Sequence, residues 1–233
     1  MLDFIGIGAQ KAGTTWLYEN LQKHPGIRFP AGKEIHFWDM HYENGIEWYK
    51  SLFAQADTEI KNGEITPAYA IMPKEKIKEL HGNFPDVRLI YILRDPIERA
   101  WSSALMALVR AEMKIAEASD QWFIDHFNSQ GSLQRSDYES CIANWLGFYP
   151  KQQLLIMDFG RIKASPLAFL KQCAEHIGVT GSFFDTISEK VVREKIHATA
   201  GNLIRPSLLP VMEKIYGEKR NFYDKLFLTE NKL

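Results

Sequence analysis

The sequence predicts an α/β fold in which a P-loop-like parallel β-sheet is flanked by helices on both faces. Short apolar stretches with strand character alternate with longer segments whose apolar residues recur at helical spacing. Residues 87–93 are almost continuously apolar, which is typical of a central strand that a parallel sheet buries on both faces. A glycine-containing loop joins the first predicted strand to a helix that begins with hydroxyl residues. In such sheets, ligands bind at the carboxyl ends of the strands.

Length and composition agree with one globular domain. The chain has 233 residues, enough for a large core, and we expect residues 1–233 to form a single domain. Hydrophobic residues make up 45% of the chain and charged residues 24%, both ordinary values. The net charge of −1 gives no support for a nucleic-acid partner or for binding to an anionic membrane. No signal peptide or membrane-spanning apolar stretch is visible, so we expect a cytoplasmic protein without a membrane span.

The expected strands and helices follow one another along the whole chain. Strands are expected at residues 4–7, 27–29, 63–67 (running into a proline turn), 87–93 and 153–157. Helices are expected at residues 14–21, 42–53, 72–80, 97–115, 138–148, 166–177 and 208–216. Pro96 stands near the start of one predicted helix and Gly178 ends another, as these residue types commonly do. Residues 118–134 have weaker helical periodicity and are expected to form a helical cover.

Two cysteines and two aromatic residues of the second half are expected in the core. Cys141 and Cys173 match no metal-binding spacing and lie in helix-like apolar segments, so we expect buried free thiols. Tyr138 and Trp145 lie on one predicted helix at near-helical spacing, which favours core packing over adenine stacking.

The loop within FIGIGAQKAGTTWL (residues 4–17) predicts an anion-binding site. Free backbone N–H groups and the positive end of the helix dipole converge there. The glycine spacing overlaps the nucleotide-binding pattern G-x-x-x-x-G-K-[ST], but Thr14 occupies the position of the lysine, which has moved to Lys11. Because a triphosphate needs that lysine on its β- and γ-phosphates, this loop is expected to hold a different anion. The alternative is a strand–turn–helix whose glycines serve only tight packing.

A second phosphate-binding segment is expected in YILRDPIERAWSS (residues 91–103). Arg94 lies at the carboxyl end of the predicted central strand, and Ser102 follows on the next helix. A guanidinium and a hydroxyl can both bond one phosphate. The alternative for Arg94 is an ion pair with a carboxylate such as Asp95.

The segment KEIHFWD (residues 33–39) places Glu34, His36 and Asp39 among aromatic residues. A positioned carboxylate can take a proton from a reacting hydroxyl. The alternative for Glu34 is a simple ion pair with Lys11 or Lys33.

These three segments, taken together in this order, resemble the sulfotransferases that use 3′-phosphoadenosine 5′-phosphosulfate (PAPS). More narrowly, the chain is similar to the carbohydrate branch that includes the heparan sulfate N- and 3-O-sulfotransferases. The match runs from Phe4 to about Ser103 and continues more loosely through residues 136–159. The resemblance implies in-line transfer of the sulfuryl group from PAPS to an acceptor hydroxyl of a carbohydrate or small molecule. The product is adenosine 3′,5′-bisphosphate (PAP), and the reaction requires no metal.

The resemblance also implies roles for individual residues. Glu34 matches the catalytic base, and His36 is the next candidate for that role. His36 and Asp39 match residues that shape the acceptor site, while Arg94 and Ser102 match those that hold the 3′-phosphate. Lys11 would also stabilise the leaving phosphate oxygen. The residues implied to hold the 5′-phosphosulfate are Lys11, Ala12, Gly13, Thr14, Thr15 and Trp16.

The chain departs from the heparan branch in two places. Ile65 stands where that branch has a lysine before Thr-Pro-Ala-Tyr, which argues against a heparan-like acceptor. The late basic loop of that branch is matched only at residues 193–198, where Lys195 is a candidate for contact with the nucleotide. The chain also offers no long basic track for a polyanion, so a small or weakly charged acceptor is expected.

Two other functions remain open from the sequence. A P-loop kinase is disfavoured because the lysine of the G-K-[ST] pattern is missing. A non-catalytic nucleotide-binding module would keep Arg94 and Ser102 but would have no need for Glu34 beside His36.

Overall fold

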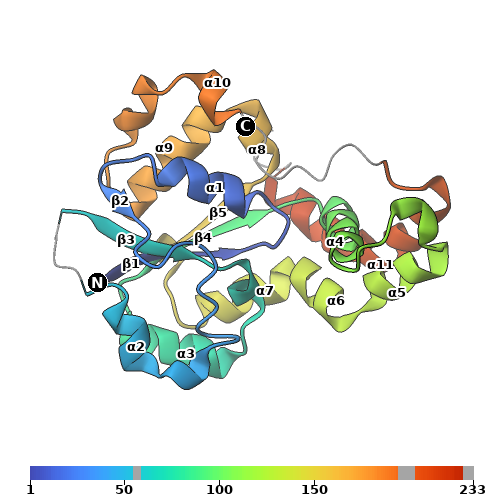
Figure 1. Cartoon of the computed structure of the whole chain (residues 1–233), viewed down its shortest axis with the longest axis horizontal. Coiled ribbons are helices and arrows are strands. Elements are labelled where there is room, and N and C mark those ends of the chain that lie inside the picture. Colours follow the sequence, from blue (N-terminus) through green and yellow to red (C-terminus); the bar gives the residue numbers. More distant parts are fainter. Residues whose placement is uncertain (55–58, 194–202, 228–233) are drawn as a thin grey trace.

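A computed structural model of the chain describes residues 1–54, 59–193 and 203–227, and its five strands form a sheet in which every pairing is parallel (Figure 1). The order across the sheet is β2-β3-β1-β4-β5. The strands are β1 (Leu2–Gly8), β2 (Ile27–Arg28), β3 (Lys61–Ile65), β4 (Arg88–Leu93) and β5 (Leu154–Asp158). Helices cover both faces of the sheet, so the predicted fold class is confirmed.

The middle strand of the sheet is β1, so the prediction that residues 87–93 form the central strand is wrong. β4 lies between β1 and β5, and all its residues but the first are buried. Its composition therefore resembles that of a central strand. β1 is less continuously apolar because the neighbouring strand leaves no room for a side chain at Gly6. A Cβ atom there would lie 2.8 Å from Cγ1 of Ile65 on β3.

The helices lie in three groups around the sheet (Figure 1). One face is covered by α1 (Thr14–Leu21), α8 (Gly160–Ala164), α9 (Pro166–Ile177) and α10 (Glu189–Val192). The other face is covered by α2 (Ile46–Ser51), α3 (Lys74–Asn83) and α7 (Tyr138–Leu146). The third group lies beyond the carboxyl ends of the strands and consists of α4 (Pro96–Arg110), α5 (Asp120–Asn128), α6 (Gln130–Ser136) and α11 (Leu209–Phe227).

Two predicted helices are shorter in the structure because the backbone leaves the helical region. The helix predicted at residues 42–53 is interrupted at Gly45, whose φ of 79° and ψ of 154° are not helical. Only α2 follows it as an α-helix. α4 ends at Arg110 instead of continuing to residue 115, and Glu112 just beyond it is left-handed with a φ of 55°.

Two other helical segments also differ from their predicted boundaries. The cover expected at residues 118–134 consists of two helices, α5 and α6, separated at Ser129. The extended backbone of Ser129 ends the first helix, and its side-chain oxygen accepts a hydrogen bond from the Ser132 N–H to cap the second. α11 is longer than the predicted helix at residues 208–216 and continues to Phe227.

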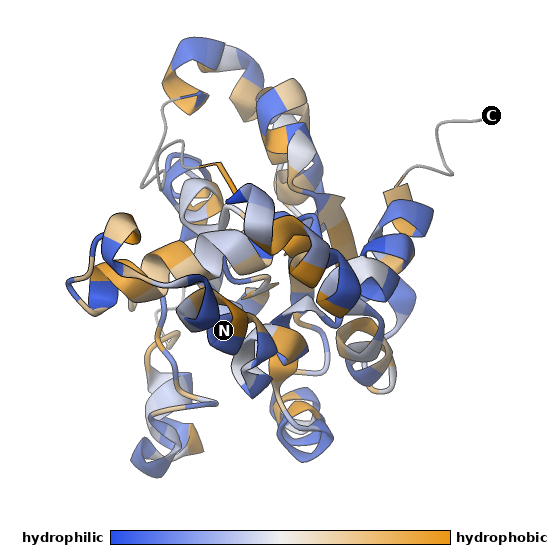
Figure 2. Cartoon of the chain, turned by 90° about the vertical axis from the view of Figure 1, so that its right-hand side faces the viewer, coloured by the Kyte–Doolittle hydropathy of each residue, from blue (hydrophilic) through white to orange (hydrophobic). Residues whose placement is uncertain are grey.

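The buried side chains form two hydrophobic clusters. The larger surrounds the sheet and contains Tyr138 and Trp145 together with the free thiols of Cys141 and Cys173, so the predicted burial of all four is confirmed. The smaller joins α4, α5 and α11. Figure 2, which looks from that side, shows hydrophobic and hydrophilic residues along the same helices, as expected for helices that bury one face. Within the described ranges, no helix has the length and apolar character needed to cross a bilayer.

Candidate functional site

The first loop ends β1 and starts α1. Gly13 is the N-cap of α1 with a φ of 82°, a left-handed conformation that favours glycine. A Cβ atom there would also lie 2.7 Å from Cδ1 of Ile162, so packing requires glycine as well. The N–H groups of Thr14, Thr15 and Trp16 lie in the first turn of α1, where the helix offers no acceptors for them. The loop can therefore present several donors to one anion.

Lys11 and Arg94 lie together although they are far apart in the sequence. The Arg94 guanidinium donates a hydrogen bond of 3.2 Å to the backbone carbonyl oxygen of Lys11. Lys11 is half-buried, and its pKa is lowered by burial and by the positive charges of Arg94 and Arg110. Cations at such close quarters repel one another, so a bound anion would stabilise this arrangement.

The ion pair that the sequence suggested between Arg94 and Asp95 is not formed. Asp95 instead caps α4 and pairs with Arg220 on α11 at 2.8 Å. Arg94 donates two hydrogen bonds of 3.2 Å to Glu98, one turn along α4. The Glu98 side chain is 57% exposed, and ion pairs with exposed groups contribute little. Ser102 follows on the same helix and is largely buried.

The segment KEIHFWD brings its three titratable candidates together. Nδ1 of His36 lies 2.9 Å from Asp39, and Nε2 of His36 lies 3.8 Å from the Glu34 carboxylate. The backbone N–H of Glu34 donates to the Ile65 carbonyl oxygen at 3.0 Å, which ties this segment to the carboxyl end of β3. Glu34 also pairs with Lys33, as its alternative interpretation expected.

Left-handed backbone conformations gather at these same residues. In the described part of the chain, four residues other than glycine have a positive φ, namely Lys11, Glu34, His36 and Glu112. Three of the four are candidate site residues. Such conformations cost free energy and cluster at functional sites, so they support a functional role for each of the two segments.

The other predicted binding residues lie on the first loop or outside the described ranges. The Trp16 ring is buried, and its indole N–H donates to the Val192 carbonyl oxygen at 2.6 Å. Only its backbone N–H is therefore positioned to meet a ligand at the loop. Ala12 is buried, and its N–H donates to the Ala9 carbonyl oxygen at 3.1 Å. Lys195 lies outside the residues that the structure describes.

Comparison with known proteins identifies the family. The sulfotransferase domain family matches residues 2–201, which is most of the chain. The chain belongs to the sulfotransferase family. This membership confirms the resemblance that the three segments indicated.

Individual sulfotransferases resemble the chain at different levels. Mouse heparan sulfate glucosamine 3-O-sulfotransferase 6 is 26% identical over 222 residues, which cover 92% of this chain but only 59% of that protein. A sulfotransferase from Alicyclobacillus acidocaldarius superimposes with a TM-score of 0.73 at 21% identity, covering 97% of this chain and 95% of that one. Mouse sulfotransferase SULT7A1 complexed with PAP superimposes with a TM-score of 0.55 at 14% identity, covering 94% and 83%. These two structures share the fold.

Sequence reasoning missed a buried carboxyl group beneath the candidate site. Glu64 lies on β3, is fully buried and accepts hydrogen bonds from the Tyr49 and Thr66 hydroxyls, the second at 2.9 Å. Burial raises its pKa to about 7, despite these hydrogen bonds. Glu64 precedes Ile65, whose carbonyl oxygen holds Glu34. The one signal in the sequence was a glutamate inside the strand predicted at residues 63–67.

We expect Glu64→Gln to remove part of the pH dependence of stability. The folded protein holds the Glu64 proton up to about pH 7, whereas the unfolded chain releases it near the ordinary value of 4.5. The free energy of unfolding should therefore fall as the pH rises between these values, by about 3 kcal/mol from this group. Denaturant unfolding at pH 4.5, 6 and 7.5 measures the effect. The variant should lose this decline, whereas Glu43→Gln at an exposed carboxylate should retain it. Parallel profiles for wild type and Glu64→Gln would contradict the prediction.

A second missed group is the guanidinium of Arg99, which is completely buried on α4. It donates to the Ser136 hydroxyl at 2.8 Å and to the carbonyl and hydroxyl oxygens of Ser132 at 3.0 and 3.1 Å. One of its terminal nitrogens has no hydrogen-bond partner among the described residues. Burial lowers the pKa of Arg99. The positive charge of Arg99 adds to the positive potential at this end of the sheet.

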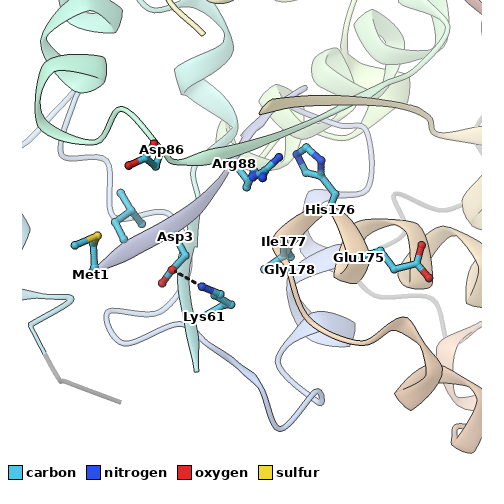
Figure 3. Close-up of a pocket in the computed structure, with 10 residues that line it drawn as sticks. Met1, Asp3, Lys61, Asp86, Arg88, Glu175, His176, Ile177 and Gly178 are labelled. Atoms are coloured by element: carbon cyan, nitrogen blue, oxygen red, sulfur yellow. Dashed lines mark hydrogen bonds and ion pairs between the residues drawn. The ribbon is translucent and has the colours of Figure 1, made fainter. Parts of the chain in front are cut away.

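A cavity of about 410 Å³ lies at the opposite edge of the sheet (Figure 3). It adjoins the amino ends of β1 and β4, and its lining includes Asp3 and Lys61, which pair with each other at 3.1 Å. Parallel sheets bind their ligands at the carboxyl ends of the strands. This cavity is therefore separate from the candidate site.

Proposed function

We propose that the chain, acting as one domain over residues 1–233, transfers the sulfuryl group of PAPS to an acceptor hydroxyl. The observation that carries the proposal is the contact between Arg94 and the Lys11 carbonyl oxygen, at 3.2 Å. It joins the two segments that we predict to bind phosphate, at the carboxyl edge of the sheet. Family membership and the fold shared with a sulfotransferase crystallised with PAP support the same nucleotide.

The described residues fit a nucleotide that carries anionic groups at both its 5′ and 3′ positions. Lys11 and the amides of the first turn of α1 suit the 5′-phosphosulfate. Arg94 and Ser102 suit the 3′-phosphate, because a guanidinium and a hydroxyl can share one phosphate. Glu98 would give up an exposed ion pair to that phosphate, at little cost. Lys195 stays a candidate for a further contact.

The side chains can divide the work of an in-line transfer. PAPS supplies a sulfuryl group bonded to its 5′-phosphate oxygen. The acceptor oxygen forms a new bond to sulfur while the bond from sulfur to the phosphate oxygen breaks. Glu34 accepts the proton that the acceptor hydroxyl loses, with His36 as the neighbouring alternative base. Lys11 and the loop amides stabilise the negative charge that remains on the phosphate oxygen.

The two rival functions predict different nucleotide preferences. A kinase binds ATP with magnesium, and that nucleotide has no 3′-phosphate for Arg94. A non-catalytic module would bind PAP but would not need the left-handed Glu34 and His36 close to each other. Glu34, His36 and Asp39 lie together on a segment that is tied to the carboxyl end of β3, and this arrangement favours the transferase.

We expect PAP to raise the melting temperature clearly, whereas ATP or AMP at equal concentration should do little, with or without magnesium. Charge-assisted hydrogen bonds contribute about 1.5–3 kcal/mol each, so loss of the 3′-phosphate should weaken binding roughly ten- to a hundredfold. Arg94→Ala should abolish the preference and Ser102→Ala should reduce it.

Arg88→Ala is the matched control for this thermal-shift experiment. Arg88 lies at the other end of β4, on the opposite edge of the sheet, where it donates a hydrogen bond to the Gln152 carbonyl oxygen. The control should keep the wild-type preference for PAP. If ATP with magnesium stabilised the protein more than PAP does, the result would contradict the proposed sulfotransferase function and support a kinase function.

A further inference from the structure

A smaller cavity of about 220 Å³ lies between the first loop and helices α4, α5 and α6. Its lining includes three basic side chains, Arg110 on α4, His126 on α5 and Arg135 on α6. None of the described residues that line it is acidic. We call it the α4–α6 pocket. Nothing in the proposed transfer so far uses its three basic groups.

The α4–α6 pocket adjoins the first loop of the candidate site. Gln10 of the first loop lines it, directly before Lys11. On its α4 side, Arg110 is close enough to lower the pKa of Lys11. On its α6 side, Arg135 is within electrostatic range of Asp39 in the acceptor segment. A molecule in this pocket would therefore lie beside the first loop and within electrostatic range of the segment that carries Asp39.

No carboxylate is among the described residues that line the α4–α6 pocket. One nitrogen of Arg135 donates to the Gly131 carbonyl oxygen at 3.0 Å, but its Nε is buried without a partner among the described residues. Ser132, which also lines the pocket, bonds the buried Arg99 guanidinium. Arg110 is exposed and Arg135 is half-buried, and a desolvated guanidinium N–H that lacks an acceptor, such as Nε of Arg135, costs free energy. An anion in the pocket would lower that cost and occupy the unused donor positions.

We infer that the α4–α6 pocket binds the acceptor and selects a hydroxyl compound that carries an anionic group, such as a carboxylate or sulfate. Arg110 and Arg135 hold the anionic group, which positions the hydroxyl near Glu34. This inference rests on the proposed sulfotransferase function. The volume of the α4–α6 pocket lies below the range of about 300–1,000 Å³ for pockets of drug-sized ligands. The pocket therefore suits one small group and not a long chain.

This inference changes the acceptor expected from the sequence. The net charge of −1 suggested a weakly charged acceptor. The net charge, however, averages over the whole chain and does not reveal a local cluster of basic residues. The α4–α6 pocket gathers basic residues that are scattered along the sequence from position 110 to position 135. Local charge at the site, and not the total charge, decides which acceptor binds there.

A matched pair of sugar derivatives tests the inference. The probes are 4-nitrophenyl β-D-glucuronide, which carries a carboxylate, and 4-nitrophenyl β-D-glucoside, which does not. Their binding is measured by isothermal titration calorimetry with the full chain saturated with PAP. We expect the glucuronide to bind at least about tenfold more tightly, since charge-assisted hydrogen bonds discriminate by that amount or more. Arg135→Gln and Arg110→Gln should each reduce this preference severalfold, whereas Arg88→Gln on the opposite edge of the sheet should keep it.

The outcomes separate this inference from the proposed function. Equal affinities for the two glycosides would contradict the inference of an anionic acceptor, and so would no measurable binding of either. If PAP still binds, the proposed sulfotransferase function would stand. A preference that survives in both Arg110→Gln and Arg135→Gln would overturn the inference as well. Weaker PAP binding in Arg135→Gln would assign the pocket to the nucleotide, against the inference. A wild-type chain that fails to bind PAP would instead contradict the proposed function.

Discussion

Glu34→Gln should lower the turnover of sulfuryl transfer by roughly 10²-fold or more, the usual scale for removal of a positioned base. The glutamine has nearly the same shape as glutamate, but it cannot accept the proton of the acceptor hydroxyl at neutral pH. PAP binding should stay near wild type, because Glu34 lies on the segment of residues 33–39 and not on the first loop. Turnover with labelled PAPS and calorimetric titration with PAP measure the two effects separately.

The ion pair between Glu34 and Lys33 requires its own control. If the pair only holds the segment in place, Lys33→Met should reduce turnover as much as Glu34→Gln does. We expect a much smaller loss, because the pair is solvent-accessible on the Glu34 side, which is 43% exposed. A fully active Glu34→Gln variant would remove Glu34 from the mechanism, and His36→Ala would then test the neighbouring imidazole as the base.

Lys11→Met should lower turnover by about 10²–10³-fold, as is typical when one donor to a developing negative charge is removed. Methionine keeps most of the length and the apolar stem of lysine but supplies no charge. PAP also places a phosphate at the first loop, so its affinity should fall, but by clearly less than turnover. This difference arises because the charge on the leaving oxygen is largest in the transition state.

The matched control for Lys11→Met is Lys78→Met on α3, an exposed lysine on one face of the sheet. It changes the net charge equally and should leave turnover and PAP binding unchanged. An equal loss of turnover and PAP affinity in Lys11→Met would contradict a transition-state role. Lys11 would then be a residue that binds the nucleotide uniformly.

Several features of the site were predictable because they depend on local chemistry. The periodicity of apolar residues determined the parallel α/β class, and α9 has the predicted bounds of residues 166–177. The glycine loop with its displaced Lys11 indicated an anion site that differs from a triphosphate site. The spacing of Glu34, His36 and Asp39 placed three titratable groups within reach of one another, and the structure brings them together.

Other features depend on contacts between residues that are distant in the sequence, and only the tertiary structure decided them. Strand order is one, because β1 becomes the middle strand only when β3 and β4 pair on either side of it. The ion-pair partner of Arg94 is another such feature. Asp95 caps α4 and pairs with Arg220, and Arg94 pairs with Glu98 instead.

The charges around the site also needed the folded chain. Glu64 lies among polar residues in the sequence, and only the packing of β3 buries it and raises its pKa to about 7. Arg110 and Arg135 line the same pocket because the fold brings α4, α5 and α6 together next to the first loop. Sequence alone determined which chemical groups the chain carries and their local backbone settings. Long-range packing decided which groups lose their water and which charges face one another, because desolvation and Coulomb energy depend on three-dimensional distance.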